Sequence, residues 1–253
     1  MKILLVISFA VLAIIIPGDI IIKRFSPPQG YERVAASPGS FADYLQKLSL
    51  KPIGTHTKTY QGNIAQTDPY TAAVVDLSLG HEDLQQCADA VMRLRGEYLY
   101  QQKRYPEIAF NFVNGFKCDY LHYAKGYRYK NNKWVLKATE SYSYPTFLNY
   151  MNLVFSYAST LSLDKELVKV NAADELQAGD VFIKGGSPGH CFVVMSVAVN
   201  QQHQKVFMLA QSFMPAQDIQ VLKYESPWFS LDKPANIPYG DLINTRYLKR
   251  FSN

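Results

Sequence analysis

Residues 84–100 have the clearest helical periodicity in the chain and constrain the fold more than any other stretch. Their apolar members recur at steps of three and four residues, which places them on one helix face: Leu84, Cys87, Ala88, Val91, Leu94 and Tyr98. Asp83 precedes them and is of a type that caps the free N–H groups at a helix start. We therefore predict a helix that begins near Asp83 and carries Cys87 close to its beginning.

The composition is that of a globular protein. The chain has 253 residues, of which 48% are hydrophobic and 19% charged, and this excludes a disordered polypeptide. The net charge of +5 is spread along the chain without a basic block, so we expect no nucleic-acid partner. The 18 tyrosines and 14 phenylalanines suit an aromatic-lined groove and an ordinary strand-rich core equally well.

The N-terminus has the pattern of a targeting segment. Lys2 is followed by an apolar run over residues 3–16, which ends at Pro17-Gly18-Asp19. The run has the length of a signal-peptide core and is short for a membrane span. We expect residues 1–25 to be an export signal or, alternatively, an uncleaved anchor, and residues 26–253 to form one domain. The expected location is the periplasm or cell envelope, with membrane contact only through this segment.

Short helices and strands follow one another along the rest of the chain. A helix is expected over 41–48, with Ser37 or Ser40 as its cap, and another over 146–161 after Pro145. Strands are expected over 57–60, 71–79, 181–184, 191–199 and 205–212, with a hairpin over 127–136 that turns at Asn131-Asn132. The tail from residue 226 is expected to wrap the surface. These patterns predict the α+β class, with helices against one mostly antiparallel sheet.

The three cysteines and the histidines are the candidates for chemistry. In an oxidising compartment Cys118 pairs with Cys191, or all three cysteines stay free thiols. Cys87, on an apolar helix face, is an inert core residue unless a histidine lies within hydrogen-bond reach. His190, after a glycine-rich turn, is a candidate base or a residue that satisfies a carbonyl of that turn. The histidines have no metal-binding spacing, so we expect no metal and no cofactor.

Three segments resemble the NlpC-type papain-like cysteine hydrolases. Leu176-Gln-Ala-Gly-Asp-Val-Phe resembles a strand entry of that group, Cys87-Ala-Asp-Ala-Val its nucleophile, and His190 before a hydrophobic strand its base. The resemblance implies a papain-like, NlpC-like fold in which Gln211, one strand after His190, is the third catalytic residue. Cys87 and His190 are 103 residues apart (190 − 87), which implies an insertion over 104–170.

The chemistry implied by this resemblance is acyl transfer. A helix N-terminus and a nearby imidazolium both favour the thiolate of Cys87. His190 would take and return the proton. The amide oxygen of Gln211 can fix the tautomer of the histidine ring.

Five further residues are candidates for substrate binding. The Cys87 N–H, with Gln85 or Gln86, could hold the oxyanion. Arg93 and Arg95 could bind a substrate carboxylate, although arginines on helices more often pair with a neighbouring acid. Ser187, in the turn before His190, is a candidate substrate contact.

Over most of its length the chain resembles the domain-of-unknown-function 4846 family of exported bacterial proteins. The segments that carry this resemblance are Pro38-Gly-Ser-Phe-Ala-Asp-Tyr-Leu45, Asp83-Leu-Gln-Gln-Cys-Ala-Asp-Ala-Val-Met-Arg-Leu-Arg95, Phe110-Asn-Phe112, Asn114-Gly-Phe116, Gly185-Gly-Ser-Pro-Gly-His190 and Leu209-Ala-Gln-Ser-Phe-Met-Pro-Ala-Gln217. The resemblance covers roughly residues 28–250 and implies a bacterial envelope protein without assigning an activity.

Two functions follow as hypotheses. The first is a secreted cysteine hydrolase or acyltransferase, of the peptidase or amidase type, that acts on an amide bond of the cell-wall peptide class through Cys87, His190 and Gln211. The second is a non-catalytic envelope module on the same scaffold that binds a peptide or glycan. The sequence leaves the oligomeric state open.

Overall fold

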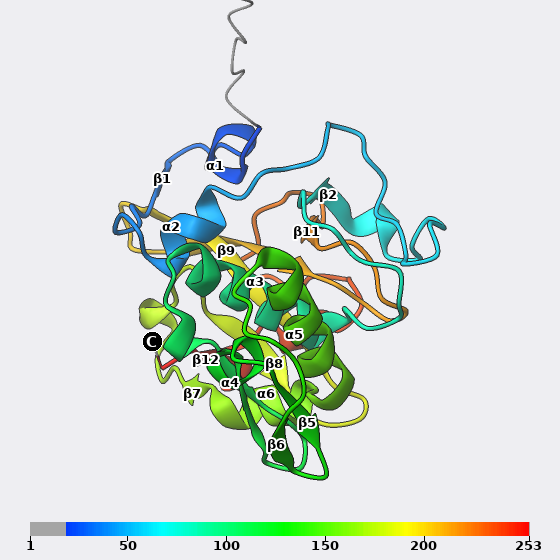
Figure 1. Ribbon diagram of the computed structural model, residues 1–253. Helices are drawn as coiled ribbons and strands as arrows, with labels where there is room; N and C mark the ends of the chain where they lie inside the picture. The colour runs from blue at the N-terminus through cyan, green and yellow to red at the C-terminus, as the bar shows by residue number, and fades with distance from the viewer. Residues whose placement is uncertain (1–18, 253) are drawn as a thin grey trace, which may run out of the picture.

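The computed structural model describes residues 19–252, which form an α+β fold around one antiparallel sheet, as the sequence predicted (Figure 1). The strand order is β2-β11-β10-β9-β8-β12-β7, and β1 pairs with the far end of β9. These strands are β1 (Tyr31–Arg33), β2 (Thr71–Val74), β7 (Val168–Lys169), β8 (Val181–Lys184), β9 (His190–Asn200), β10 (Lys205–Gln211), β11 (Gln220–Leu222) and β12 (Leu248–Arg250).

Strand β9 is the centre of this sheet and is buried on both faces. It pairs with β10 on one side and with β8 and β1 on the other. Cys191, Val193 and Met195 belong to the core on one face of the sheet. Phe192 and Val194 belong to the core on the other face, which the C-terminal tail covers. A strand covered on both faces has no exposed side that needs polar residues, and this explains its continuous apolar sequence.

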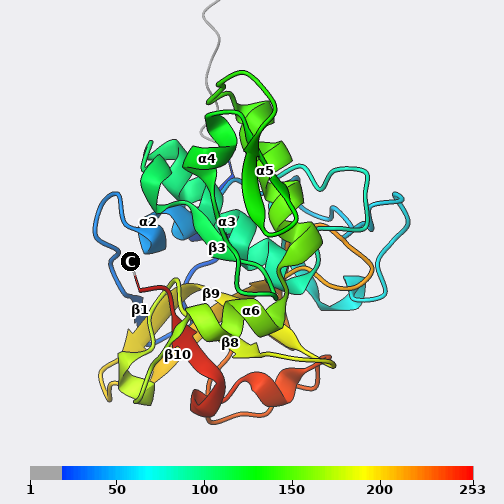
Figure 2. The ribbon, with the colours of Figure 1, turned by 60° about the horizontal axis from the view of Figure 1, so that its bottom comes forward.

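Helix α3 (Cys87–Gln101) lies between the sheet and a second helix, α5 (Tyr144–Tyr157) (Figure 2). All its residues from Ala88 to Leu99 are buried. Gly96 allows a close approach to α5, because a Cβ atom there would lie 3.1 Å from Met151 Sδ. The other helices are α1 (Ile21–Arg24), α2 (Phe41–Gln46), α4 (Tyr120–Ala124) and α6 (Thr160–Glu166).

The burial of α3 includes an ion pair. Arg93 Nε donates to Glu97 Oε1 at 2.7 Å, and both side chains are almost fully buried. The Tyr144 hydroxyl donates to the same Glu97 oxygen at 2.7 Å, and Arg93 Nη1 donates to Gln85 Oε1 at 3.2 Å. Each charge therefore has partners inside the protein, which a buried charge requires.

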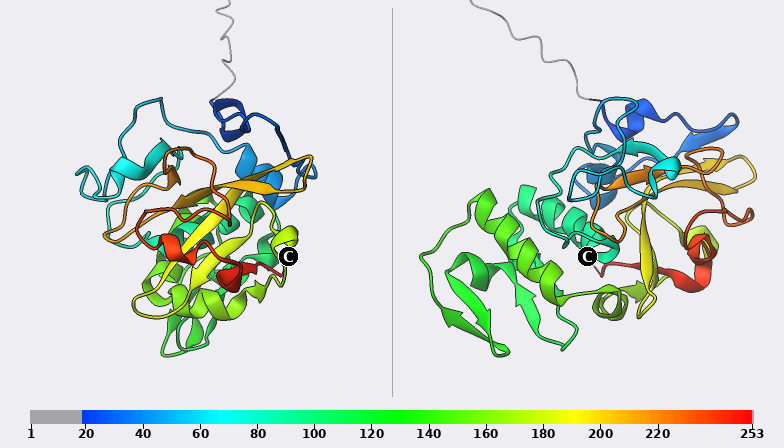
Figure 3. Two further views of the ribbon diagram at one scale, coloured as in Figure 1. Left: turned by 180° about the vertical axis from the view of Figure 1, so that it is seen from behind. Right: turned by 90° about the vertical axis from the view of Figure 1, so that its right-hand side faces the viewer.

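Residues 105–157 form a layer on the side of α3 that faces away from the sheet (Figure 3). The layer contains the hairpins β3 (Ala109–Asn111)–β4 (Lys117–Asp119) and β5 (Tyr127–Lys130)–β6 (Lys133–Leu136), together with α4 and α5. Asn131 and Asn132 have φ of 51° and 59°, as a tight two-residue hairpin turn requires, so the predicted hairpin is confirmed. This layer occupies much of the segment that the sequence marked as an insertion.

Two predicted helices form, with small changes at their ends. Ser40 caps α2, because its hydroxyl accepts from the Asp43 N–H at 3.2 Å, as predicted. Helix α5 begins at Tyr144 with Pro145 in its first turn, and it ends at Tyr157 instead of residue 161. It ends earlier because Ser159 starts a new helix, α6, by accepting from the Leu161 N–H.

Three expectations about chain segments were wrong. Residues 57–60 form only isolated bridges, Lys58 with Ile64 and Thr59 with Gln217. The tail does not only wrap the surface, since it ends as β12, between β8 and β7. Residues 19–25 belong to the fold, because Ile21 is fully buried in the main core. The folded domain therefore begins before residue 26.

The apolar run predicted as a signal or anchor lies outside the described residues, apart from its flank after residue 18. Within residues 19–252, none of the helices has both the length and the apolar character that crossing a membrane requires.

The buried ion pair of α3 predicts a large effect of mutation. Glu97→Ala should lower the free energy of unfolding by about 3–5 kcal/mol, because it leaves the buried Arg93 without its carboxylate. The control is Glu107→Ala, which removes the acid of the exposed Arg104–Glu107 pair and should cost less than about 1 kcal/mol. Urea denaturation measures both, and equal losses in the two variants would contradict the role given to Glu97.

Candidate active site

Cys87 is the first residue of α3, whereas the sequence predicted a helix that begins near Asp83. A position at the helix start favours the reactive thiolate form of cysteine. Gln86 is the N-cap: its side chain accepts from the Asp89 N–H, and the Asp89 carboxylate accepts from the Gln86 N–H at 3.0 Å. The predicted cap, Asp83, instead accepts from the Ala216 N–H at 2.6 Å. The helix therefore begins three residues later than expected, and Cys87 lies at the positive end of the helix dipole.

His190 and Gln211 lie side by side on neighbouring strands. His190 is the first residue of β9 and Gln211 the last of β10, so the antiparallel pairing brings them to the same end of the sheet. His190 Nε2 and Gln211 Oε1 are 2.7 Å apart, and both residues are almost fully buried. Because an amide oxygen only accepts, the hydrogen lies on Nε2 and Nδ1 is left for another partner.

The segment before Cys87 is attached to the strand that carries Gln211. The Ser212 hydroxyl lies 2.8 Å from the carbonyl oxygens of Gln85 and Gln217 and can donate to either. The bond between Asp83 and Ala216 joins the same two chain segments. These contacts bring the start of α3 to the end of the sheet where His190 lies.

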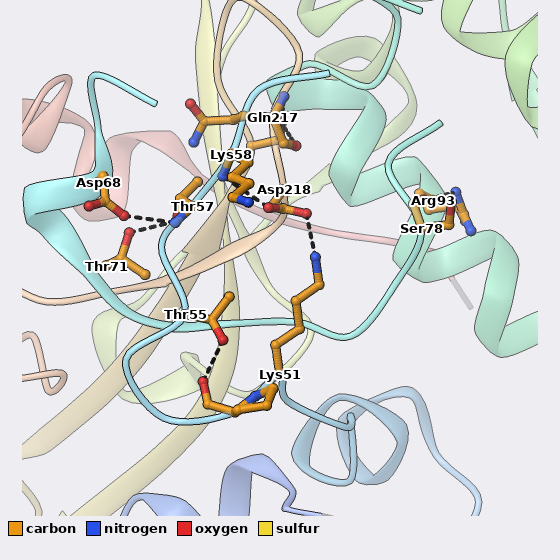
Figure 4. A network of polar contacts seen from close by, with 12 residues as sticks. Lys51, Thr55, Thr57, Lys58, Asp68, Thr71, Ser78, Arg93, Gln217 and Asp218 are labelled. Carbon is orange, nitrogen blue, oxygen red and sulfur yellow. Dashed lines mark hydrogen bonds and ion pairs between the residues drawn. The ribbon is translucent and has the colours of Figure 1, made fainter. Parts of the chain in front are cut away.

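A buried carboxylate, that of Asp218, also holds the connection between β10 and β11 in place (Figure 4). Asp218 accepts from Lys51 Nζ at 2.8 Å and from the Lys58 N–H at 2.9 Å. Its neighbour Gln217 donates to Thr67 Oγ1 at 2.7 Å. The loop that follows Gln211 is therefore fixed along most of its length.

The surroundings of Cys87 favour its thiolate. Its pKa is held well below the ordinary value, chiefly by a hydrogen bond from the Cys191 side chain. Burial of the half-buried sulfur acts against this lowering, and His190 supports it with a hydrogen bond and its positive charge. The Ala88 N–H at the helix start adds a further hydrogen bond. Several donors thus converge on one sulfur atom.

Cys191 is the partner that keeps its proton. It is fully buried, and both burial and the neighbouring Cys87 raise its pKa well above the ordinary value. Burial likewise raises the pKa of Asp89 well above its usual range. Of these two neighbouring cysteines, Cys87 is therefore the one that loses its proton more readily. All three cysteines of the protein are free, which decides between the two alternatives that the sequence left open.

Aromatic rings surround the imidazole of His190. Tyr239 stacks on it with the ring centres 4.6 Å apart and the planes inclined by 17°. Phe192 and Phe213 contact it at 4.8 Å and 5.2 Å. Tyr239 adopts a φ of 60°, in the left-handed region that is unfavourable for a residue with a bulky side chain. This conformation places its ring over the histidine.

The structure places the predicted binding residues as follows. Gln86 lies directly before Cys87, and its Nε2 donates to Asp83 at 3.2 Å. Gln85 is buried and its side-chain oxygen accepts from Arg93. Arg93 itself is bound to Glu97, which is the structural alternative that the sequence offered for it. Ser187 is exposed in the turn that precedes His190.

Sequence reasoning did not identify Cys191, Asp89, Phe213 or Tyr239 as parts of this site. Cys191 is next to His190 and Asp89 is three residues after Gln86, so adjacency and capping-box spacing were available signals. Phe213 and Tyr239 had no local signal, because tertiary folding alone brings them to His190.

The arrangement can perform nucleophilic chemistry on an acyl group. A thiolate at a helix start, an imidazole within reach and an amide oxygen behind that imidazole are the groups that acyl transfer requires. In residues 19–252 no group of His, Cys, Asp and Glu side chains could hold a metal ion.

Comparison with known proteins gives a family and no activity. None of the curated proteins and none of the solved structures matches the chain. The family model described as domain of unknown function 4846 matches residues 21–242, which include Cys87, His190 and Gln211. The chain therefore belongs to the domain-of-unknown-function 4846 family.

Proposed function

We propose that the protein is a papain-like cysteine hydrolase or acyltransferase that acts on an amide bond. The observation that carries this proposal is the position of Cys87 as the first residue of α3 beside His190, whose ring is bonded in turn to Gln211. An inert core cysteine has no need of a lowered pKa, whereas a nucleophile does. The position of Cys87 at the start of a helix packed on an antiparallel sheet also supports a papain-like architecture.

The proposed reaction proceeds through a thioester. Cys87 Sγ attacks the carbonyl carbon of the amide and forms a C–S bond. The C–N bond then breaks, and the proton held by His190 passes to the leaving amine. Water, or a second amine in an acyltransferase, attacks the thioester carbonyl and gives a proton back to His190. The C–S bond then breaks, which releases the acid or the new amide and regenerates the Cys87 thiolate. Gln211 holds the ring in the orientation that this exchange needs.

The oxyanion of the tetrahedral intermediate needs donors. The Cys87 N–H lies at the first helical position, where backbone N–H groups have no partner within the helix. A second donor is the Nε2 group of Gln86, which carries two hydrogens and gives one of them to Asp83. Both donors lie next to the nucleophile in the chain, as an oxyanion site requires.

The proposed location is the bacterial cell envelope. The single lysine and apolar run at residues 2–16 motivate export, either with cleavage of the segment or with the segment kept as an anchor. A peptide of the cell wall is the substrate class that this location would supply.

A second candidate is a peptide- or glycan-binding module without catalysis. One observation favours it: Tyr239 stacks on His190, which is almost fully buried. A substrate would then reach only the half-buried sulfur unless Tyr239 moves. Turnover separates the two candidates.

The origin of the low thiol pKa predicts how Cys87 reacts with pH. Alkylation by iodoacetamide, followed by mass spectrometry for each cysteine, should reach half its maximal rate well below pH 8.5, about the value for a free cysteine. Cys191→Ala removes the main donor to the thiolate, so the midpoint should rise by roughly one pH unit. His190→Ala should also raise it. Cys118→Ala is the control and should leave it unchanged, and the same result for Cys191→Ala would refute the assignment.

The proposed activity predicts release of an amine from cell-wall peptides. Incubation of the protein with soluble muropeptides should yield cleaved or transferred peptides, detected by mass spectrometry. Cys87→Ala should reduce this rate by at least about a thousandfold, because the proposed thioester forms on the Cys87 sulfur. Cys118→Ala should keep the rate. Binding of muropeptides without any product in the wild-type protein would reject the enzyme and favour the binding module.

A further inference from the structure

A cavity of about 470 Å³ lies beside the middle and end of α3, away from Cys87. It is bordered by residues 34–46 around α2, by residues 177–179 before β8, and by the C-terminal Arg250 and Phe251. Among the α3 residues in the cavity wall, Arg95 is the nearest to Cys87 in the sequence. At 1.5 Å per residue it lies roughly 12 Å from Cys87 along the helix axis. The cavity is therefore separate from the candidate active site, and its size is typical of small-molecule sites.

Arg95 is a buried cation whose hydrogen-bonding capacity is not used. Only 6% of its surface is exposed. Its Nη2 atom is buried and has no hydrogen-bond partner within residues 19–252. The rings of Phe41, Tyr98 and Phe251 lie 5.2, 5.3 and 5.2 Å from its guanidinium carbon. Rings this close to a guanidinium stabilise its charge, but they do not accept from all its N–H groups, which still need acceptors.

The other two arginines of the cavity show what Arg95 lacks. Arg104 Nε donates to Glu107 at 2.6 Å, and Arg250 Nε donates to Asp180 at 2.6 Å. Each has its own carboxylate, whereas among the described residues no carboxylate forms an ion pair with Arg95. Burial lowers the pKa of Arg95, and Glu107 lies near enough to oppose that effect, but the hydrogen bonds of Glu107 go to Arg104. Arg95 therefore has no carboxylate of its own in the cavity wall. Proteins seldom keep an unbalanced buried charge, because its desolvation destabilises them.

We propose that this cavity binds a small organic anion, whose carboxylate or phosphate group is held by Arg95 and whose planar apolar part lies against Phe41 and Phe251. The fork of guanidinium N–H groups matches the oxygens of either group. Arg104 and Arg250 add positive potential at the same wall without being free to replace Arg95. The aromatic side chains supply the apolar lining that a ligand of this kind needs.

Calorimetric titration with phenyl phosphate and with benzoate tests the proposal, and the stronger binder identifies the preferred anionic group. The wild-type protein should bind at least one of them, and Arg95→Met should weaken that binding by about tenfold or more through loss of charge-assisted hydrogen bonds. Benzamide, which is neutral and has the same ring, should bind much more weakly. Arg246→Met is the matched control, because Arg246 also stacks on an aromatic ring, that of Tyr247 at 4.5 Å, and is not a lining residue of the cavity.

Two further readouts keep the result unambiguous. Without ligand, Arg95→Met should melt at the same temperature as the wild type or higher, since an unpaired buried charge is removed. A crystal of the wild-type protein soaked in phenyl phosphate should show the phosphate against Arg95. The proposal is overturned if neither anion binds the wild type at millimolar concentration, if Arg95→Met binds as tightly as the wild type, or if the soaked ligand lies elsewhere.

Discussion

Helix α3 is buried from Ala88 to Leu99, so the polar groups that it carries need partners inside the protein, and Arg95 is an exception. The sheet covers one side of the helix and α5 with its hairpins covers the other. The rest of the architecture follows from this arrangement. Arg93 requires Glu97 and Gln85, and close packing against Met151 requires a glycine at position 96. Only the two ends of the helix remain open to solvent, Cys87 at its start and Tyr100 and Gln101 at its end.

The same burial causes one of two opposing effects on the pKa of the Cys87 thiol in the candidate site. A sulfur atom in an apolar environment holds its proton more tightly, and this effect opposes reactivity. Cys191, His190 and the Ala88 N–H reverse the effect because all of them stabilise the negative charge. The hydrogen bond between the Ser212 hydroxyl and the Gln85 carbonyl brings the start of α3 to the end of the sheet that carries these groups. The site therefore depends on the packing of α3 against the sheet as much as on the reactive residues themselves.

Local patterns in the sequence were sufficient for the elements that local chemistry determines. The hairpin at Asn131-Asn132, the Ser40 cap and strands β8 to β10 follow from turn residues, capping and apolar runs. The start of α3 did not follow, because Asp83 and Gln86 are both plausible caps and only the contact of Asp83 with Ala216, 133 residues away, decides between them. The strand expected at 57–60 did not form, since its residues make only isolated bridges, to Ile64 nearby and to Gln217 far along the chain.

In the candidate site, too, some residues could be predicted from local sequence and others depend on contacts between distant segments. Cys87, His190 and Gln211 could be named from short motifs, and the pairing of β9 with β10 places the last two in contact. The contact of Cys191 with Cys87 and the ring of Tyr239 over His190 depend on how three distant segments meet. The sequence marked Arg95, like Arg93, as able to bind a carboxylate, but an arginine on a helix reveals its missing partner only when its surroundings are known.

Formation of an acyl-enzyme on Cys87 tests the central claim most directly. The protein would be mixed rapidly with excess p-nitrophenyl acetate, while nitrophenolate release is followed by absorbance and the modified residue is identified by mass spectrometry. The account predicts a burst equal to the protein concentration, an acetyl group on Cys87, and loss of the burst in His190→Ala. Slow release without a burst, or acetyl groups on lysines with none on Cys87, would show that Cys87 is a buried core residue and not a nucleophile.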